Sequence, residues 1–109
     1  MARLPRALTI GPYRYELRVD APAVLTYTNI VGTGANGFSE LLEHRIVLAS
    51  AENAHHVILH EILHVLADQS GLDMRLGTDR TEDVIQSIDH LLLGVIRANP
   101  ALVEYLTET

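Results

Sequence analysis

The five residues His60-Glu61-Ile62-Leu63-His64 form the pattern H-E-x-x-H, whose residue types are those of a metal-dependent hydrolase. On a helix, side chains four residues apart lie on one face, so His60 and His64 can bind a single metal ion. Glu61 lies at the edge of that face, within reach of a water molecule beside the ion. The pattern therefore predicts His60 and His64 as zinc ligands and Glu61 as the catalytic general base.

An ordinary core helix with histidines along its edge could contain the same five residues. The neighbouring sequence therefore has to distinguish this interpretation from a metal site. Four of the six histidines of the chain fall within residues 55–64. Burying His60, Glu61 and His64 without a metal ion or polar partners would cost considerable free energy. The clustering therefore favours a metal site over the ordinary helix.

A catalytic zinc ion takes three protein ligands and leaves a fourth position for water. The metzincin pattern is excluded, because Ala67 and Ser70 stand where it needs glycine and histidine. Glu82, in the first turn of the next expected helix, is our predicted third ligand. The alternative is that residues 79–82 (Asp-Arg-Thr-Glu) form a capping box, in which Glu82 bonds to the helix N-terminus instead.

Other side chains near Glu82 are candidates either for the third metal ligand or for orienting a ligand histidine. The competing ligands are Asp79, Asp83 and His90. Gln86 and Asp89 follow Glu82 at i+4 and i+7, so either could orient a ligand histidine through its second ring nitrogen. The alternative is that both residues lie on a solvent-exposed face of the helix.

The N-terminal half of the chain predicts strands. Residues 1–8 read as a loose basic arm, and the alternation from Ile10 to Val19 predicts a half-exposed strand. The β-branched run Val24–Val31 predicts a second strand, with a short helix as the alternative. Gly32–Gly37 matches G-x-G-x-x-G but lacks the surrounding βαβ unit, so we expect a glycine turn. Glu43–Ala49 is the next expected strand.

The C-terminal half predicts helices. The motif helix is expected over Ala51–Gln69, with Ser50 as its N-cap and Gly71 as its stop. A second helix is expected over Arg80–Ala98, and a short third helix begins at Pro100. The apolar positions of the second helix form one stripe: Val84, Ile88, Leu91, Leu92 and Val95. These elements predict one α+β domain over residues 1–109, with a small antiparallel or mixed sheet before the helices.

Composition excludes several classes of protein. The chain has 109 residues and a formal net charge of -6, which argues against nonspecific nucleic-acid binding. It has no cysteine, so a disulfide framework and a cysteine zinc site are excluded. The first residues lack the apolar core of a signal peptide, and no apolar run reaches membrane-spanning length. We therefore expect a cytoplasmic protein without membrane contact.

With His60-Glu61-x-x-His64 and Glu82 on the following helix, the chain resembles a minimal gluzincin-type zincin. Over about residues 44–106 its layout is similar to the small ImmA/IrrE-like metallopeptidases and related phage-borne zincin-like proteins. The resemblance implies a minimal zincin-like fold, a zinc cofactor, and a protein or peptide substrate. Thermolysin-type gluzincins carry an aspartate four residues after the ligand glutamate, whereas this chain has Gln86 there.

The hypothesis that follows is a zinc metallopeptidase that hydrolyses a peptide bond with an activated water molecule. An edge strand, expected over Glu43–Ala49, would align the substrate backbone. Tyr27 and Tyr105 are candidates, by residue type alone, for stabilising the oxyanion. The alternatives are a non-catalytic zinc-binding regulatory module, which would close the site with a fourth protein ligand, and a metal-free interaction domain. The sequence leaves the substrate, the native metal and the oligomeric state open.

Overall fold

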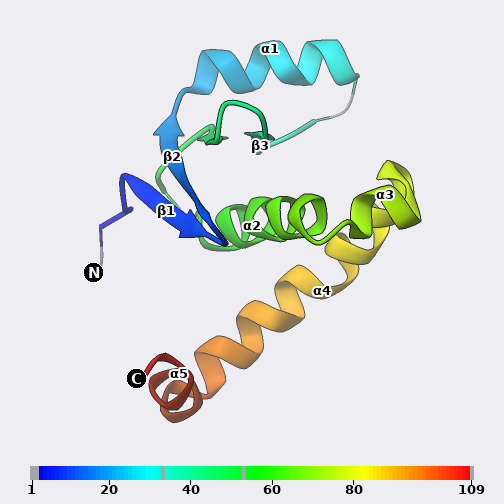
Figure 1. Cartoon of the computed structure of the whole chain (residues 1–109). Coiled ribbons are helices and arrows are strands. Elements are labelled where there is room, and N and C mark those ends of the chain that lie inside the picture. Colours follow the sequence, from blue (N-terminus) through cyan, green and yellow to red (C-terminus); the bar gives the residue numbers. More distant parts are fainter. Residues whose placement is uncertain (1–2, 33, 53, 109) are drawn as a thin grey trace.

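The structure is a computed structural model that describes residues 3–32, 34–52 and 54–108. It has an α+β architecture, as the sequence predicted, with a small mixed sheet, a long helix and a short C-terminal helix (Figure 1). In chain order the elements are β1 Ala7–Ile10, β2 Tyr13–Val19, α1 Ala21–Val31, β3 Gly37–Glu40, β4 Arg45–Leu48, α2 His55–Gln69, α3 Leu72–Leu76, α4 Thr78–Ala98 and α5 Pro100–Thr107.

The four strands pair in the order β1-β2-β4-β3. β2 and β4 pair in parallel, with Leu17 opposite Ile46, and the two outer pairs are antiparallel. The predicted strand over Ile10–Val19 is therefore a hairpin, which turns at Gly11 with a φ of 60°. The predicted strand over Glu43–Ala49 is β4, an internal strand with a neighbour on each side.

The predicted strand over Val24–Val31 is wrong, because this segment lies in helix α1. Asp20 caps the helix, and its side chain accepts a hydrogen bond from the Ala23 amide at 3.0 Å. Pro22 stands in the first turn, and Gly32 ends the helix in the left-handed conformation, with a φ of 79°. These start and stop signals outweigh the strand preference of the β-branched residues between them.

The expected loose arm over residues 1–8 is also corrected. Ala7 and Leu8 belong to β1, and Leu4 packs with Leu8 against the core, so apolar burial holds this segment in place. Met1 and Ala2 lie outside the described residues. The expected glycine turn joins α1 to β3, a helix to a strand, and its Thr33 also lies outside the described residues.

The helix boundaries differ from the predicted ones at three places. α2 begins at His55 instead of Ala51, and the expected N-cap, Ser50, accepts a hydrogen bond from the Glu52 amide instead. A short helix, α3, fills the connection that was expected to be irregular. α4 begins at Thr78 after Gly77, two residues earlier than predicted, and no side chain caps it. The capping-box alternative for residues 79–82 is therefore wrong.

The core lies between the sheet and α2. Inward-facing side chains of β1, β2 and β4 pack with Ala54 and Val65 of the helix segment; on the strands they are Ile10, Tyr15, Leu17, Ile46 and Leu48. At the C-terminal end of α2, the Gln69 side chain donates a hydrogen bond to the Ile10 carbonyl at 2.9 Å. This contact fixes the end of α2 against the hairpin.

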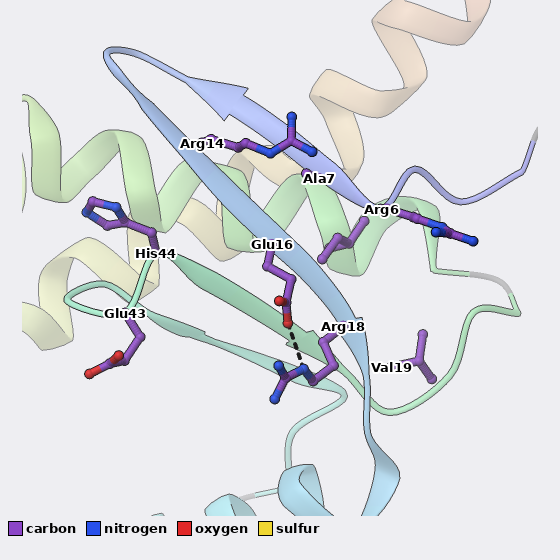
Figure 2. Close-up of a pocket in the computed structure, with 9 residues that line it drawn as sticks. Arg6, Ala7, Arg14, Glu16, Arg18, Val19, Glu43 and His44 are labelled. Carbon is purple, nitrogen blue, oxygen red and sulfur yellow. Dashed lines mark ion pairs between the residues drawn. The ribbon is translucent and has the colours of Figure 1, made fainter.

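The other face of the sheet is only partly covered. α1 packs over β3 and β4, where Tyr27 stacks on Phe38 with ring centroids 4.7 Å apart. Beside α1 the face of β2 stays open and carries Arg14, Glu16 and Arg18 (Figure 2). Arg18 Nε lies 2.7 Å from Glu16 Oε1, so part of this charge is paired at the surface. None of the described helices is long and apolar enough to cross a membrane.

Gly37 lies at the start of β3, where there is little space for a side chain. A Cβ atom there would lie 2.9 Å from the Val47 carbonyl oxygen and 3.1 Å from Val57 Cγ1. Gly37→Ala should therefore lower the free energy of unfolding by about 1–3 kcal/mol, as overpacking does, measured by urea denaturation. Gly34→Ala is the matched control, because a Cβ atom at Gly34 meets nothing within 4 Å. Equal stability of the two variants would contradict this steric reading.

Candidate metal centre

α2 and α4 pack against each other and bring together the three predicted ligands. His60 Nε2 lies 3.0 Å from Glu82 Oε1, and His64 Nε2 lies 2.6 Å from Glu82 Oε2. The two histidines come from successive turns of α2 because they are four residues apart. The carboxylate of Glu82 thus lies between both imidazoles, and the same nitrogen of each ring faces it.

His60 contacts a carboxylate with each of its ring nitrogens. Its Nδ1 lies 2.8 Å from Asp89 Oδ2, and its Nε2 faces Glu82. A neutral imidazole has one N–H, and an ionised carboxylate can only accept a hydrogen bond. One of the two contacts therefore needs either an additional proton shared by the ring and the carboxyl group or a cation between Nε2 and Glu82.

The donor set fits a metal ion with nitrogen and oxygen ligands. One donor atom from each of His60, His64 and Glu82 lies within 4.8 Å of the others. A tetrahedral zinc ion with bonds of about 2.1 Å needs its ligand atoms roughly 3.4 Å apart, a separation within that range. With Nδ1 of His60 turned to Asp89, the lone pair at Nε2 is left for the metal. These three residues could therefore hold a metal ion.

Glu61 lies next to this group but is not part of it. Its side chain is buried, 6% exposed, and its Oε1 accepts a hydrogen bond from Ser39 Oγ at 2.8 Å. Burial raises the pKa of Glu61, and the hydrogen bond from Ser39 and the nearby histidines offset this only in part. Ser39 was not foreseen in the sequence, because β3, the strand that carries it, was not predicted.

Asp89 is the residue that orients His60, and it is almost fully buried. Burial alone would raise its pKa, but hydrogen bonds from His60 and the His90 amide hold the pKa of Asp89 below its usual range. Gln86, the other expected orienting residue, donates instead to Glu82 Oε1 at 3.0 Å. Asp89 thus contacts the candidate metal group through His60, and Gln86 contacts it through Glu82.

The competing ligand candidates lie outside the group. Among the described residues, the metal-ligand cluster contains neither Asp79 nor Asp83 nor His90. Asp79 lines the groove around the cluster, and Asp83 is exposed to solvent. His90 stacks on His56, with ring centroids 4.5 Å apart. His56 precedes His60 by one turn of α2.

A groove of about 1010 Å³ surrounds the cluster, and its walls come from α1, β3, α2 and the α3–α4 region. Tyr27 lines it, whereas Tyr105 lies on α5 and does not. The five carboxylates along the groove are Glu61, Asp73, Asp79, Glu82 and Asp89. The described lining includes no arginine, so the groove has an acidic character.

The strand at the rim of this groove is β3, which corrects the expectation that Glu43–Ala49 forms the edge. β4 is paired on both sides, whereas β3 pairs with β4 alone. The Ala49 amide donates a hydrogen bond to the Asn36 carbonyl. In an antiparallel pair, every second residue bonds to the neighbouring strand and the residues between point their backbone groups away from it. The backbone groups of Gly37 and Ser39 therefore face the open side of β3.

Comparisons of this chain with protein-family models, curated proteins and solved structures gave no match.

Asp89→Asn should weaken metal binding by about 10–100-fold, as loss of an orienting carboxylate usually does, because His60 loses its charged partner. The affinity can be measured by competition with a chromogenic zinc chelator. Asp83→Asn removes an exposed carboxylate from the same helix and should leave the affinity nearly unchanged. Equal affinities in the wild type and Asp89→Asn would show that Asp89 does not support the site.

Glu61→Gln should stabilise the metal-free protein at neutral pH, because it removes a buried carboxylate whose pKa is raised. The gain should be absent below about pH 4.5, the ordinary pKa of this group, since both side chains are then neutral. It should grow as the pH rises and level off above the folded-state pKa of Glu61. A gain of about 1 kcal/mol would raise the melting temperature by roughly 4–8 °C.

The control for this stability measurement is Glu43→Gln, which alters a carboxylate on the surface. Melting temperatures of both variants and the wild type are compared in chelator-containing buffer across the pH range. If Glu61→Gln destabilised the protein at neutral pH, burial would not be the dominant effect on this carboxylate.

Proposed function

We propose that this chain is a zinc-dependent metallopeptidase that hydrolyses a peptide bond of a protein or peptide substrate. One observation carries the proposal. Donor atoms of His60, His64 and Glu82 lie close enough together to bind one metal ion, and the buried carboxylate of Glu61 lies beside them without belonging to this group. Three ligands and a separate carboxylate are what a catalytic zinc site requires. This arrangement also supports the resemblance to gluzincin-type zincins.

In the proposed mechanism, His60, His64 and Glu82 bind the ion, and Asp89 keeps Nε2 of His60 free for it. A zinc ion held there would lower the pKa of a water molecule to about 7 and polarise a carbonyl group. Glu61 would accept a proton from the water as its oxygen bonds to the peptide carbonyl carbon, and would give that proton to the amine nitrogen as the C–N bond breaks. The raised pKa of Glu61 suits this double role, because a general base works best near the operating pH.

The substrate backbone would align along β3. This edge strand borders the groove, and Gly37 and Ser39 offer their backbone groups on its open side. A peptide that adds to the edge would pass in front of Glu61, because Ser39 of the same strand bonds to that carboxylate. The Ser39 hydroxyl thus links substrate alignment to the position of the general base.

The first test compares the wild type with Glu61→Gln and His64→Ala. Glu61→Gln should retain one zinc ion per chain and lose about 10²–10⁴-fold in the rate of hydrolysis, since general-base catalysis contributes that much. His64→Ala should lose both zinc and hydrolysis. Zinc is measured by mass spectrometry of the metal, and hydrolysis by the appearance of new peptide N-termini in a diverse peptide mixture.

Glu43→Gln serves as the matched control and should behave like the wild type. Wild-type hydrolysis in Glu61→Gln would rule out the proposed mechanism. Zinc bound by the wild type with no cleavage of any peptide would favour the alternative, a non-catalytic zinc-binding module. Absence of bound metal after zinc is added back would overturn both readings.

A further inference from the structure

The C-terminal half of the molecule exposes an unusual amount of apolar surface. α4 extends away from the sheet, and α5 lies at its far end (Figure 1). Within the described residues, α5 packs on α4 alone, and none of its side chains is buried. Nine large apolar side chains of these two helices are exposed: Val84, Ile88, Leu91, Leu92, Val95, Ile96, Leu102, Tyr105 and Leu106. An apolar surface of this kind on a long helix usually has a partner.

Four of these residues form a regular stripe along α4, and we call Val84, Ile88, Leu91 and Val95 the α4 stripe. Their spacing of four, three and four residues is the a/d spacing of a coiled-coil seam. They are 42%, 42%, 72% and 49% exposed, whereas Ile85 on the same helix is 3% exposed. The sequence predicted these four positions, together with Leu92, as one apolar stripe, and the structure leaves all four partly exposed to solvent.

We propose that the α4 stripe is the interface of a homodimer, in which α4 packs antiparallel on α4 of a second copy of this chain. The spacing of the stripe is the same in both directions along the helix, so the stripe can pair with the same stripe of a second copy that runs the opposite way. With the two-fold axis between Ile88 and Leu91, each of these residues meets the other in the second copy, and Val84 meets Val95. Each contact is therefore made twice, once from each copy, as an isologous interface requires.

Charge favours the antiparallel direction. The first turns of α4 carry three acidic residues, Asp79, Glu82 and Asp83, against one basic residue, Arg80, and its last turn carries Arg97. Antiparallel packing places the end with Arg97 beside the acidic end of the other copy, and it also opposes the two helix dipoles. Parallel packing would place the acidic ends side by side and repel.

The α4 stripe alone is smaller than a standard interface, which buries about 800 Å² on each partner. The exposed apolar side chains of α5, which packs on α4, extend the apolar surface beyond the stripe. The stripe also lies about 120–180° around α4 from Glu82, since Ile88 follows it by six residues and Leu91 by nine, at 3.6 residues per turn. Dimerisation therefore leaves the metal centre open.

The test is the mass of the untagged full chain by sedimentation velocity over a range of concentrations. We expect twice the chain mass of 12.0 kDa. Leu91→Glu should give the monomer, whereas Leu42→Glu, the same change at a 96% exposed leucine on the turn after β3, should stay dimeric. A monomeric wild type at every concentration, or a dimeric Leu91→Glu, would overturn the proposal.

Cross-linking tests the direction of the pair. The chain has no cysteine, so introduced thiols are the only ones that can react. A mixture of Val84→Cys and Val95→Cys should form disulfide-linked dimers on oxidation, and neither variant alone should do so. Cross-linking of Val84→Cys with itself would contradict the antiparallel pairing. Leu91→Glu should keep its zinc, so the outcome for the dimer is separate from the outcome for the proposed peptidase.

Discussion

Charge balance between α2 and α4 is the constraint on which the rest of the structure depends. Glu61, Glu82 and Asp89 meet His60 and His64 where the two helices cross. Ionised carboxylates beside neutral imidazoles would leave three negative charges in a largely buried contact, which is costly. A divalent cation held by the donor atoms of His60, His64 and Glu82 would offset them. Binding of such an ion would therefore also stabilise the packing of α4 on α2.

Apolar packing contributes less to this contact than is usual between two helices. Of the buried residues of α4, Thr81 and Asp89 are polar, and Ile85 is the apolar one. The Thr81 hydroxyl donates to the Gly77 carbonyl within its own helix at 2.9 Å, so it adds no bond to α2. The polar cluster therefore contributes to the packing of α4 on α2 beside Ile85, and the residues of the candidate metal site are also packing residues.

The parts of the fold that follow local rules were predictable from sequence. Helical spacing places His60 and His64 together whatever the rest of the chain does, and the same periodicity relates Asp89 to Glu82. α1 was missed because β-branched residues were weighed above the cap at Asp20 and the stop at Gly32. The capping signal lies outside the segment whose composition suggested a strand.

β3 could not be read from its residues. Its four residues, Gly-Phe-Ser-Glu, contain one large apolar side chain and no clear alternation. The strand exists because β4 offers it an edge and Phe38 stacks on Tyr27 of α1. These are long-range contacts, so the role of Ser39 at Glu61 could be recognised only in three dimensions.

The shortness of β3 has a consequence for thermal behaviour. A four-residue strand paired on one side opens locally at a free-energy cost below that of global unfolding. Each such opening would take Ser39 away from Glu61, whereas His60 and His64 belong to a longer helix. The loss of this hydrogen bond should therefore begin at a lower temperature than the melting of the whole chain.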